Sequence, residues 1–238
     1  MIWVRDITGR FAERPHYEPE ELDNDCEAIV EDVLLRRHGE VVYPVLTDDL
    51  FFMLEQTACV DPYAEFDPAE GEIWGESEFR PGEQPRVFIR HELSENPRYE
   101  NPLRTTLTHE FSHVHYHGPL FELERSRGES FEDGRNKTWV CKRDHVEGHR
   151  KRDWTEWQAS YCSGALLIPK RALREAVKEF LGSHELIPGQ VMRDTLDEIE
   201  LVSEVVRRFA VSREAAAVRL RQQRHVVEGM PSGEAFRA

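Results

Sequence analysis

The sequence predicts an α+β fold that is mainly helical, with a small β-sheet and a C-terminal element resembling a helix-turn-helix unit. Two stretches, EIWGESEF (72–79) and RVFIRHEL (86–93), read as strands separated by the turn-forming RPGEQP. Apolar residues before and after these strands recur at helical spacing. In VVRRFAVSREAAAVRLRQ (205–222), a short turn at Val211 and Ser212 separates two helical runs.

The composition is typical of a soluble globular protein, since 39% of the 238 residues are hydrophobic and 32% are charged. The chain has no run of about 18 apolar residues and no apolar leader with a small-residue cleavage site. We therefore expect a cytoplasmic protein that does not bind membranes. The scattered cysteines lack CxxC pairing, which favours reduced thiols: Cys26, Cys59, Cys141 and Cys162.

The net charge of -15 is concentrated in the first 100 residues, which hold 25 acidic and 9 basic side chains. A strongly acidic face repels phosphate backbones and is compatible with recognition of a basic polypeptide. A solvated, solubilising face is the plainer interpretation. In either case we expect no direct nucleic-acid binding by most of this surface.

The elements before the first strand are predicted in order. Residues 11–25 are polar and contain prolines, which suggests a loosely ordered entry. A helix with its cap near Asp23 or Asn24 follows, supported by the apolar residues Ile29, Val33 and Leu34. Residues 41–46, VVYPVL, then read as a short extended piece, and a helix covers residues 48–56.

Residues 103–117 predict a helix packed against the core. Asn101 can cap this helix, Pro102 suits its first position, and Gly118-Pro119 ends it. One face carries an apolar stripe: Leu103, Leu107, Phe111 and Val114.

The chain loses periodicity between residues 121 and 153 and reads as a long loop over the site. A second strong helix covers residues 153–168 and is closed by Pro169. Residues 170–225 read as mostly helical, with a break at Pro188-Gly189.

The stretch TTLTHEFSHVHYH (105–117) contains an HExxH motif at His109, Glu110 and His113. Histidines four apart on a helix share one face, so both imidazoles can reach one ion. Two histidines leave zinc short of ligands, and the open positions take a third protein ligand and a water. Glu110 is placed to accept the proton of that water and to pass it to a leaving amine.

A rival metal pair exists, because His113 and His117 are also four residues apart. His109 and His117 cannot easily share an ion, since eight residues of helix separate them by about 12 Å. The pair at 109 and 113 leaves Glu110 positioned as the base, whereas Val114 occupies the equivalent place in the rival pair, so we choose the former. His115 and His117 then read as polar or capping residues near a helix end.

Glu156 is the candidate third ligand. It stands at the start of an apolar helix, as a carboxylate ligand would if that helix packed against the HExxH helix. The alternative interpretation is a glutamate favoured there by the helix dipole. Glu147 and Asp153 are the next candidates.

Two further features of the sequence bear on the site. Cys141, His145 and His149 share four-residue spacing and suggest a second metal site, but Gly148 and the surrounding charges favour a substrate-facing loop or solvated surface. A tetrahedral intermediate also needs an oxyanion partner, and nothing in the sequence selects among the candidates Tyr116, Arg143 and His145.

With HExxH followed by EWQASYCSGALLIP (156–169), the chain resembles the ImmA/IrrE-type metallo-endopeptidases. That family couples a TxxHExxH segment to a later helix with a pattern like ExxAxxFAxxLLMP and then to a helix-turn-helix-like element. The residues that match in register are Glu156, Ala159, Leu166, Leu167 and Pro169. The departures, which alter packing more than chemistry, are Cys162, Ser163 and Ile168.

The resemblance spans roughly residues 45–225 and implies a zincin-like metallopeptidase core. It implies an intracellular zinc endopeptidase in which His109, His113 and Glu156 bind Zn²⁺ and Glu110 is the general base. The family's substrates are transcriptional repressors, so the implied partner is a protein substrate. The predicted organisation is an acidic N-terminal extension with a helix, the core, and a C-terminal helical segment: residues 1–44, 45–182 and 183–238.

Two other classes of function compete with the peptidase. A DNA-binding regulator would use residues 200–225, where arginines gather, and would leave the metal site structural or vestigial. Against this, a structural zinc site has four protein ligands and needs no adjacent glutamate. A toxin-antitoxin-type protein that binds a partner without turnover is the third possibility.

Overall fold

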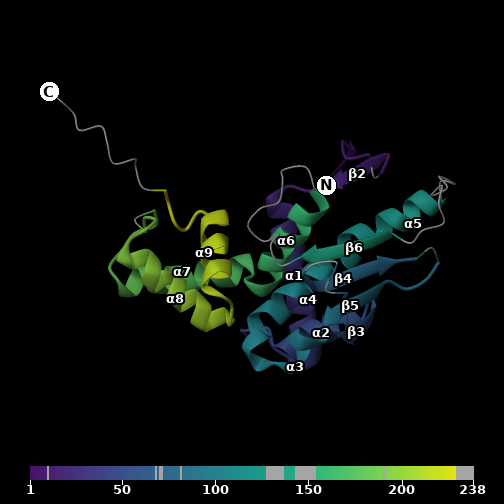
Figure 1. The fold of residues 1–238 in the computed structure, drawn as a ribbon. Helices are drawn as coiled ribbons and strands as arrows, with labels where there is room; N and C mark the ends of the chain where they lie inside the picture. The colour runs from purple at the N-terminus through teal and green to yellow at the C-terminus, as the bar shows by residue number, and fades with distance from the viewer. Residues whose placement is uncertain are drawn as a thin grey trace. The chain divides into compact units, whose positions relative to one another are not determined.

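The computed structural model describes residues 1–9, 11–67, 69, 72–80, 82–126, 137–142, 154–189 and 191–228 (Figure 1). The chain forms two compact units, Met1–Leu167 and Ile168–Ala238. Helices predominate over a small mixed sheet, which confirms the predicted α+β, mainly helical class. The domain limits predicted at residues 44/45 and 182/183 stay predictions.

The first unit begins with a two-stranded antiparallel ribbon of β1 (Ile2–Arg5) and β2 (Glu13–His16), which leads into α1 (Pro19–His38). The expected loose entry over residues 11–25 is therefore wrong, and so is the cap near Asp23 or Asn24. The helix starts earlier because Pro19 occupies its first position and Glu18 forms a capping box.

The main sheet has the strand order β3-β5-β4-β6 (Figure 1). β3 and β5 are parallel, and β4 is antiparallel to both β5 and β6. The strands are β3 (Cys59–Ala64), β4 (Ile73–Phe79), β5 (Arg86–Arg90) and β6 (Lys137–Lys142).

β4 confirms the first predicted strand, and β5 confirms residues 86–90 of the second, whose last three residues are helical instead; β3 and β6 were not predicted. The sequence of β3, CVDPYA, contains Asp and Pro, which weaken a strand signal, although Pro is tolerated on an edge strand such as this one. Residues 121–126 are helical and β6 also lies within residues 121–153, so the prediction of one continuous loop there is wrong for these two segments. The extended piece predicted at residues 41–46 forms no strand.

The helices of the first unit pack around this sheet. They are α1, α2 (Thr47–Glu55), α3 (His91–Glu95), α4 (Glu100–Ser112), α5 (Gly118–Ser126) and α6 (Trp154–Leu167). α4 contacts α6, α2 and β4, and α6 also contacts α1. α4 therefore lies at the centre of the unit, with the apolar stripe Leu103, Leu107, Phe111 and Val114 buried as predicted. α2 and α6 confirm the helices predicted at 48–56 and 153–168.

The helix predicted over residues 103–117 does not end at Gly118-Pro119. It passes through a π-helical turn, His113–His117, and continues as α5. Pro119 cannot donate an N–H and its ring would crowd the carbonyl four residues earlier in a regular helix. The π turn accommodates it, with the Gly118 N–H bonded to the carbonyl of His113 five residues before.

The second unit contains α7 (Lys170–Ser183), α8 (Leu196–Phe209) and α9 (Arg213–Gln222). The predicted break at Pro188-Gly189 is confirmed, and Gly189 has a positive φ of 86°. The turn between α8 and α9 has Ala210 in the left-handed conformation, and Ser212 caps α9 by accepting from the Ala215 N–H. This confirms the helix-turn-helix-like shape. Among the described residues, none of the helices could cross a membrane.

Candidate metal centre

The structure brings together His109 from α4, His113 from the π turn that follows it, and Glu156 from α6. Nε2 of His109 lies 3.3 Å from Oε2 of Glu156, and Nε2 of His113 lies 3.4 Å from Oε1 of the same carboxylate. The two Nε2 atoms are 3.0 Å apart. Both imidazoles are buried, and the potential ligand atoms of the three residues all lie within 4.8 Å of one another. The predicted crossing of the two helices thus places three donors around one point.

This donor set fits a zinc ion. Two nitrogens and one carboxylate are the protein ligands of many catalytic zinc sites, and tetrahedral bonds of about 2.0–2.1 Å would place two nitrogens about 3.3 Å apart. Burial raises the pKa of Glu156, but hydrogen bonds from His109 and His113 outweigh this effect and hold the pKa below its ordinary value. The carboxylate is therefore charged, which is the form that binds a cation.

Glu110 lies beside this group and is completely buried. Its Oε2 accepts a hydrogen bond of 2.6 Å from Oγ of Ser77 on β4, whereas Oε1 has no hydrogen-bond partner among the described residues. Burial raises the pKa of Glu110 to about 7, although the neighbouring His109 and the Ser77 hydroxyl act to lower it. A carboxylate with one oxygen held by a hydroxyl, the other without a hydrogen-bond partner among the described residues, and a pKa near neutrality has the properties of a general base.

Gly75 on β4 allows the strand to approach α4 closely. A Cβ atom at this position would lie 2.6 Å from Cγ2 of Thr106 and 3.0 Å from Oε1 of Glu110. Gly75 and Ser77 share the buried face of β4, so this strand shapes the environment of the glutamate. Sequence reasoning did not identify either residue. The available signal was a glycine inside a strand, which often marks a close backbone approach.

We expect Gly75→Ala to lower the free energy of unfolding by about 1–3 kcal/mol, because the added methyl group overpacks the contact with Thr106 and Glu110. Urea denaturation measures this change. Gly182→Ala is the matched control, since a Cβ at that helical position meets nothing within 4 Å and should leave stability unchanged or raise it by up to about 1 kcal/mol. Equal stabilities of the two variants would contradict the close approach.

His117 is fully buried, so its interpretation as a polar or capping residue is wrong. Its Nδ1 lies 3.0 Å from Nδ1 of His113, its Nε2 lies 3.5 Å from Oε1 of Gln158, and its ring packs edge-on against Trp154. Burial lowers the pKa of His117 well below its ordinary value, and the nearby His113 lowers it further. The rival pair therefore does not share the atoms of the candidate centre, because His117 faces the other nitrogen of His113.

Two of the three residues between His113 and His117, His115 and Tyr116, contact α1. His115 is partly exposed, with Nε2 3.5 Å from Oδ2 of Asp25, as expected of a polar position. The hydroxyl of Tyr116 donates to Asp25 Oδ2 at 2.7 Å and lies 3.5 Å from Sγ of Cys26. Burial and the nearby Cys26 raise the pKa of Tyr116. These contacts bind the hydroxyl to α1 and do not support its candidate role as the oxyanion partner.

Several sequence candidates lie outside the described residues, namely Arg143, His145, Glu147, His149 and Asp153. Cys141 belongs to β6, and its side chain is not described. The cysteines that the structure describes, Cys26, Cys59 and Cys162, are free thiols, as predicted.

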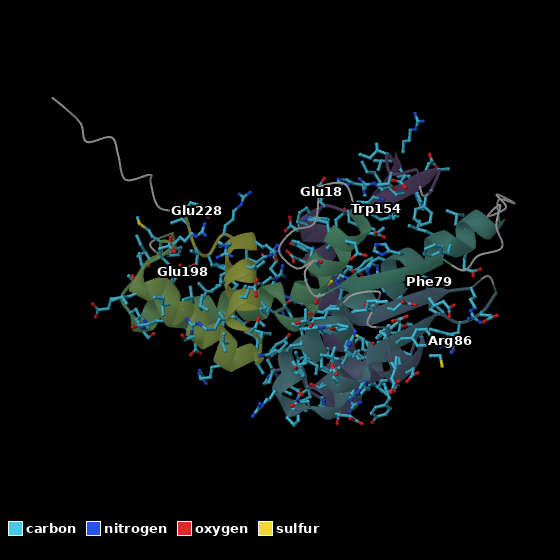
Figure 2. The ribbon with its side chains drawn as sticks, viewed as in Figure 1. Glu18, Phe79, Arg86, Trp154, Glu198 and Glu228 are labelled. Carbon is cyan, nitrogen blue, oxygen red and sulfur yellow. The ribbon has the colours of Figure 1, made fainter. Side chains whose placement is uncertain are left out.

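The start of α6 is held by the N-terminal ribbon (Figure 2). Nε1 of Trp154 donates to Oδ1 of Asp6 at 3.2 Å, and the Arg14 guanidinium lies over the Trp154 ring at 4.9 Å. Trp154 is two residues before Glu156, so these contacts help to position the carboxylate at the candidate centre.

Comparison with known proteins agrees with the resemblance seen in the sequence. Residues 145–221 match the model of the IrrE N-terminal-like domain, a peptidase family designated M78. The matched segment contains Glu156 and the helices α6 to α8 with most of α9, and it begins after the HExxH motif. A search of curated proteins found no match. Residues 145–221 are thus similar to the IrrE N-terminal-like domain, which confirms the resemblance of the chain to the ImmA/IrrE family.

Proposed function

We propose that the protein is a cytoplasmic zinc-dependent endopeptidase with a regulatory role, whose substrate is a protein such as a transcriptional repressor. The observation that carries this proposal is the convergence of His109, His113 and Glu156 beside the buried Glu110. The match to a peptidase family supports the reaction class. The resemblance to ImmA/IrrE proteins supports the substrate class, and the acidic first 100 residues are compatible with a basic polypeptide.

The residues of the site divide the chemistry between them. Zinc held by His109, His113 and Glu156 would polarise the scissile carbonyl and make a water molecule more acidic. Glu110 accepts the proton of the attacking water on Oε1 and delivers it to the leaving amine. Ser77 holds Oε2 of Glu110, so that Oε1 keeps one orientation. Burial of Glu110 keeps bulk water from competing for this proton.

Removal of the metal tests this proposal. We expect the purified full chain to bind about one zinc per chain and to cleave an unstructured basic polypeptide or a helix-turn-helix repressor. Treatment with a strong chelator should abolish cleavage, and added zinc should restore it, because the ion supplies the electrophile. Zinc is measured by mass spectrometry and cleavage by gel electrophoresis. Cleavage that persists in the chelated, zinc-free protein would contradict the proposal.

The six arginines of residues 200–225 include three, Arg207, Arg208 and Arg219, that are buried or paired with a carboxylate. Arg219 is buried, and its Nε donates to the carbonyl of Ile168 at 3.1 Å. Arg207 pairs with Glu204, and Arg208 pairs with Glu179. These pairs reduce the local positive charge available to phosphates, so they favour the peptidase over a DNA-binding regulator.

We therefore expect the protein to have little affinity for duplex DNA at physiological salt, as measured in a mobility-shift assay. Arg213 and Arg221 are the suitable residues to replace, because they are more exposed than the buried Arg219. Tight, salt-sensitive binding that is lost in the double alanine variant and retained in Arg36→Ala would instead support the regulator.

A further inference from the structure

Asp6 lies where the chain turns from β1 toward β2, and it is buried. Its Oδ1 accepts from the Thr8 N–H at 2.9 Å, and its Oδ2 accepts from the Phe11 N–H at 3.1 Å. The Thr8 hydroxyl also donates to this carboxylate, at 2.8 Å from Oδ1 and 2.7 Å from Oδ2. One side chain therefore organises the turn of the N-terminal ribbon, and the same Oδ1 accepts from Nε1 of Trp154 on α6.

The Asp6 carboxylate is charged in this environment. Burial raises its pKa, but hydrogen bonds from Thr8, Phe11 and Trp154 outweigh burial and hold the pKa below its ordinary value. A charged acceptor forms a stronger hydrogen bond than a neutral one. The bond to Trp154 is therefore a charge-assisted contact between the ribbon and the first residue of α6.

The Trp154 ring is also held by packing. The Phe11 ring meets it edge-on, with the centroids 6.2 Å apart, and the Arg14 guanidinium covers it at 4.9 Å. Phe11 in turn meets Phe121 of α5 at 5.3 Å between centroids. Trp154 and Glu156 lie in the same turn of α6, so a shift of the ring would also move the backbone that carries Glu156.

Glu156 depends on such support more than the other two candidate ligands. His109 and His113 have helical turns on both sides, whereas Glu156 lies in the first turn of its helix, where the N–H groups lack intrahelical partners. The Glu156 side chain is 14% exposed, compared with 7% for His109 and 0% for His113. The start of α6 is therefore the part of the centre that outside contacts must hold.

We propose that Asp6 is a positioning residue for the metal centre, which holds the N-terminal ribbon against Trp154 and so fixes the first turn of α6 with Glu156 in place. The effect on zinc rests on the proposed function, but the effect on the helix start requires no bound ion. Asp6 lies outside both the HExxH motif and the matched segment 145–221.

Amide hydrogen exchange in the metal-free full chain tests the positioning directly. In an α-helix the N–H groups of residues 158–160 bond to the carbonyls of the first turn of α6. We expect Asp6→Ala and Trp154→Phe to accelerate exchange at these amides and to leave exchange in α2 of the same unit unchanged. A loss of global stability alone would accelerate exchange in both helices.

Trp154→Phe removes the indole N–H but keeps an aromatic ring at this position. It leaves the turn around Asp6 intact and decides the question if Asp6→Ala does not fold.

Competition with a chromophoric chelator measures the zinc affinity of the same proteins. We expect each variant to bind zinc about 3–10-fold more weakly, as the loss of one hydrogen bond implies. Both substitutions remove the bond between Asp6 and Trp154, so the double variant should bind zinc no more weakly than Asp6→Ala alone. Two independent structural losses would instead multiply.

Ile7→Ala is the matched control. Ile7 follows Asp6 in the same turn and is 84% exposed, so its replacement should change neither the exchange rates nor the zinc affinity. Unchanged exchange at residues 158–160 in Asp6→Ala or in Trp154→Phe would overturn the inference, as would losses of zinc affinity that multiply in the double variant. Failure of the unmodified protein to bind zinc would refute the proposed function, and the exchange rates would still decide this inference.

Discussion

Glu156→Ala is expected to abolish both zinc retention and peptide cleavage. Glu156 would supply the oxygen donor, since its two carboxylate oxygens lie 3.3 Å and 3.4 Å from the Nε2 atoms of His109 and His113. With only two imidazoles left, a zinc ion would lack one of its three protein ligands. An ion bound by these residues would also link α4 to α6, so we expect zinc to raise the melting temperature of the unmodified protein but not that of this variant.

The measurement is zinc content by mass spectrometry after dialysis, together with a thermal melt with and without zinc. Glu175→Ala is a suitable control, since it removes an exposed helical carboxylate from α7. This control should retain one zinc per chain and the stabilisation by zinc. A Glu156→Ala variant that holds zinc as tightly as the control would show that Glu156 is not a ligand. Glu147 and Asp153 would then be the candidates for the third ligand.

The elements with strong local signals could be predicted from the sequence. The strands β4 and β5, which flank a turn-rich segment, were identified, and so were the helix α6 and the helix-turn-helix-like pair α8 and α9. The edge strand β3 and the N-terminal ribbon were missed, because their formation depends on pairing with distant or weakly patterned segments.

The continuation of the HExxH helix was missed for a different reason. Gly118-Pro119 is a strong local signal for a helix end, and it would end a regular α-helix. The π turn at His113–His117 shifts the hydrogen bonds to a spacing of five, which removes the conflict with Pro119. The spacing of apolar residues in the sequence does not predict a π turn.

The candidate site was predictable where spacing along one helix determines geometry. His109, Glu110 and His113 lie together because residues of one helical turn must do so, and the family pattern indicated Glu156. Ser77 and Gly75 could not be found in this way, because their roles depend on the packing of β4 against α4. The role of His117 was misjudged because its burial results from the same packing.

The central claim is that binding of the metal and transfer of the proton belong to adjacent residues, His109 and Glu110. Glu110→Gln preserves the size of the side chain, and its amide oxygen can still accept the hydrogen bond from Ser77. An amide cannot take a proton from water, however, so the chemical step should lose the general base. A general base contributes about 100-fold or more to such a rate, whereas the three proposed ligands are unchanged.

The most direct test therefore measures zinc content and the rate of cleavage of one repressor substrate for Glu110→Gln and the unmodified protein in parallel. The chemistry proposed for Glu110 predicts about one zinc per chain in both proteins and a cleavage rate at least about 100-fold lower in the variant. A Glu110→Gln protein that binds zinc and cleaves as fast as the unmodified protein would contradict the assignment of Glu110 as the general base.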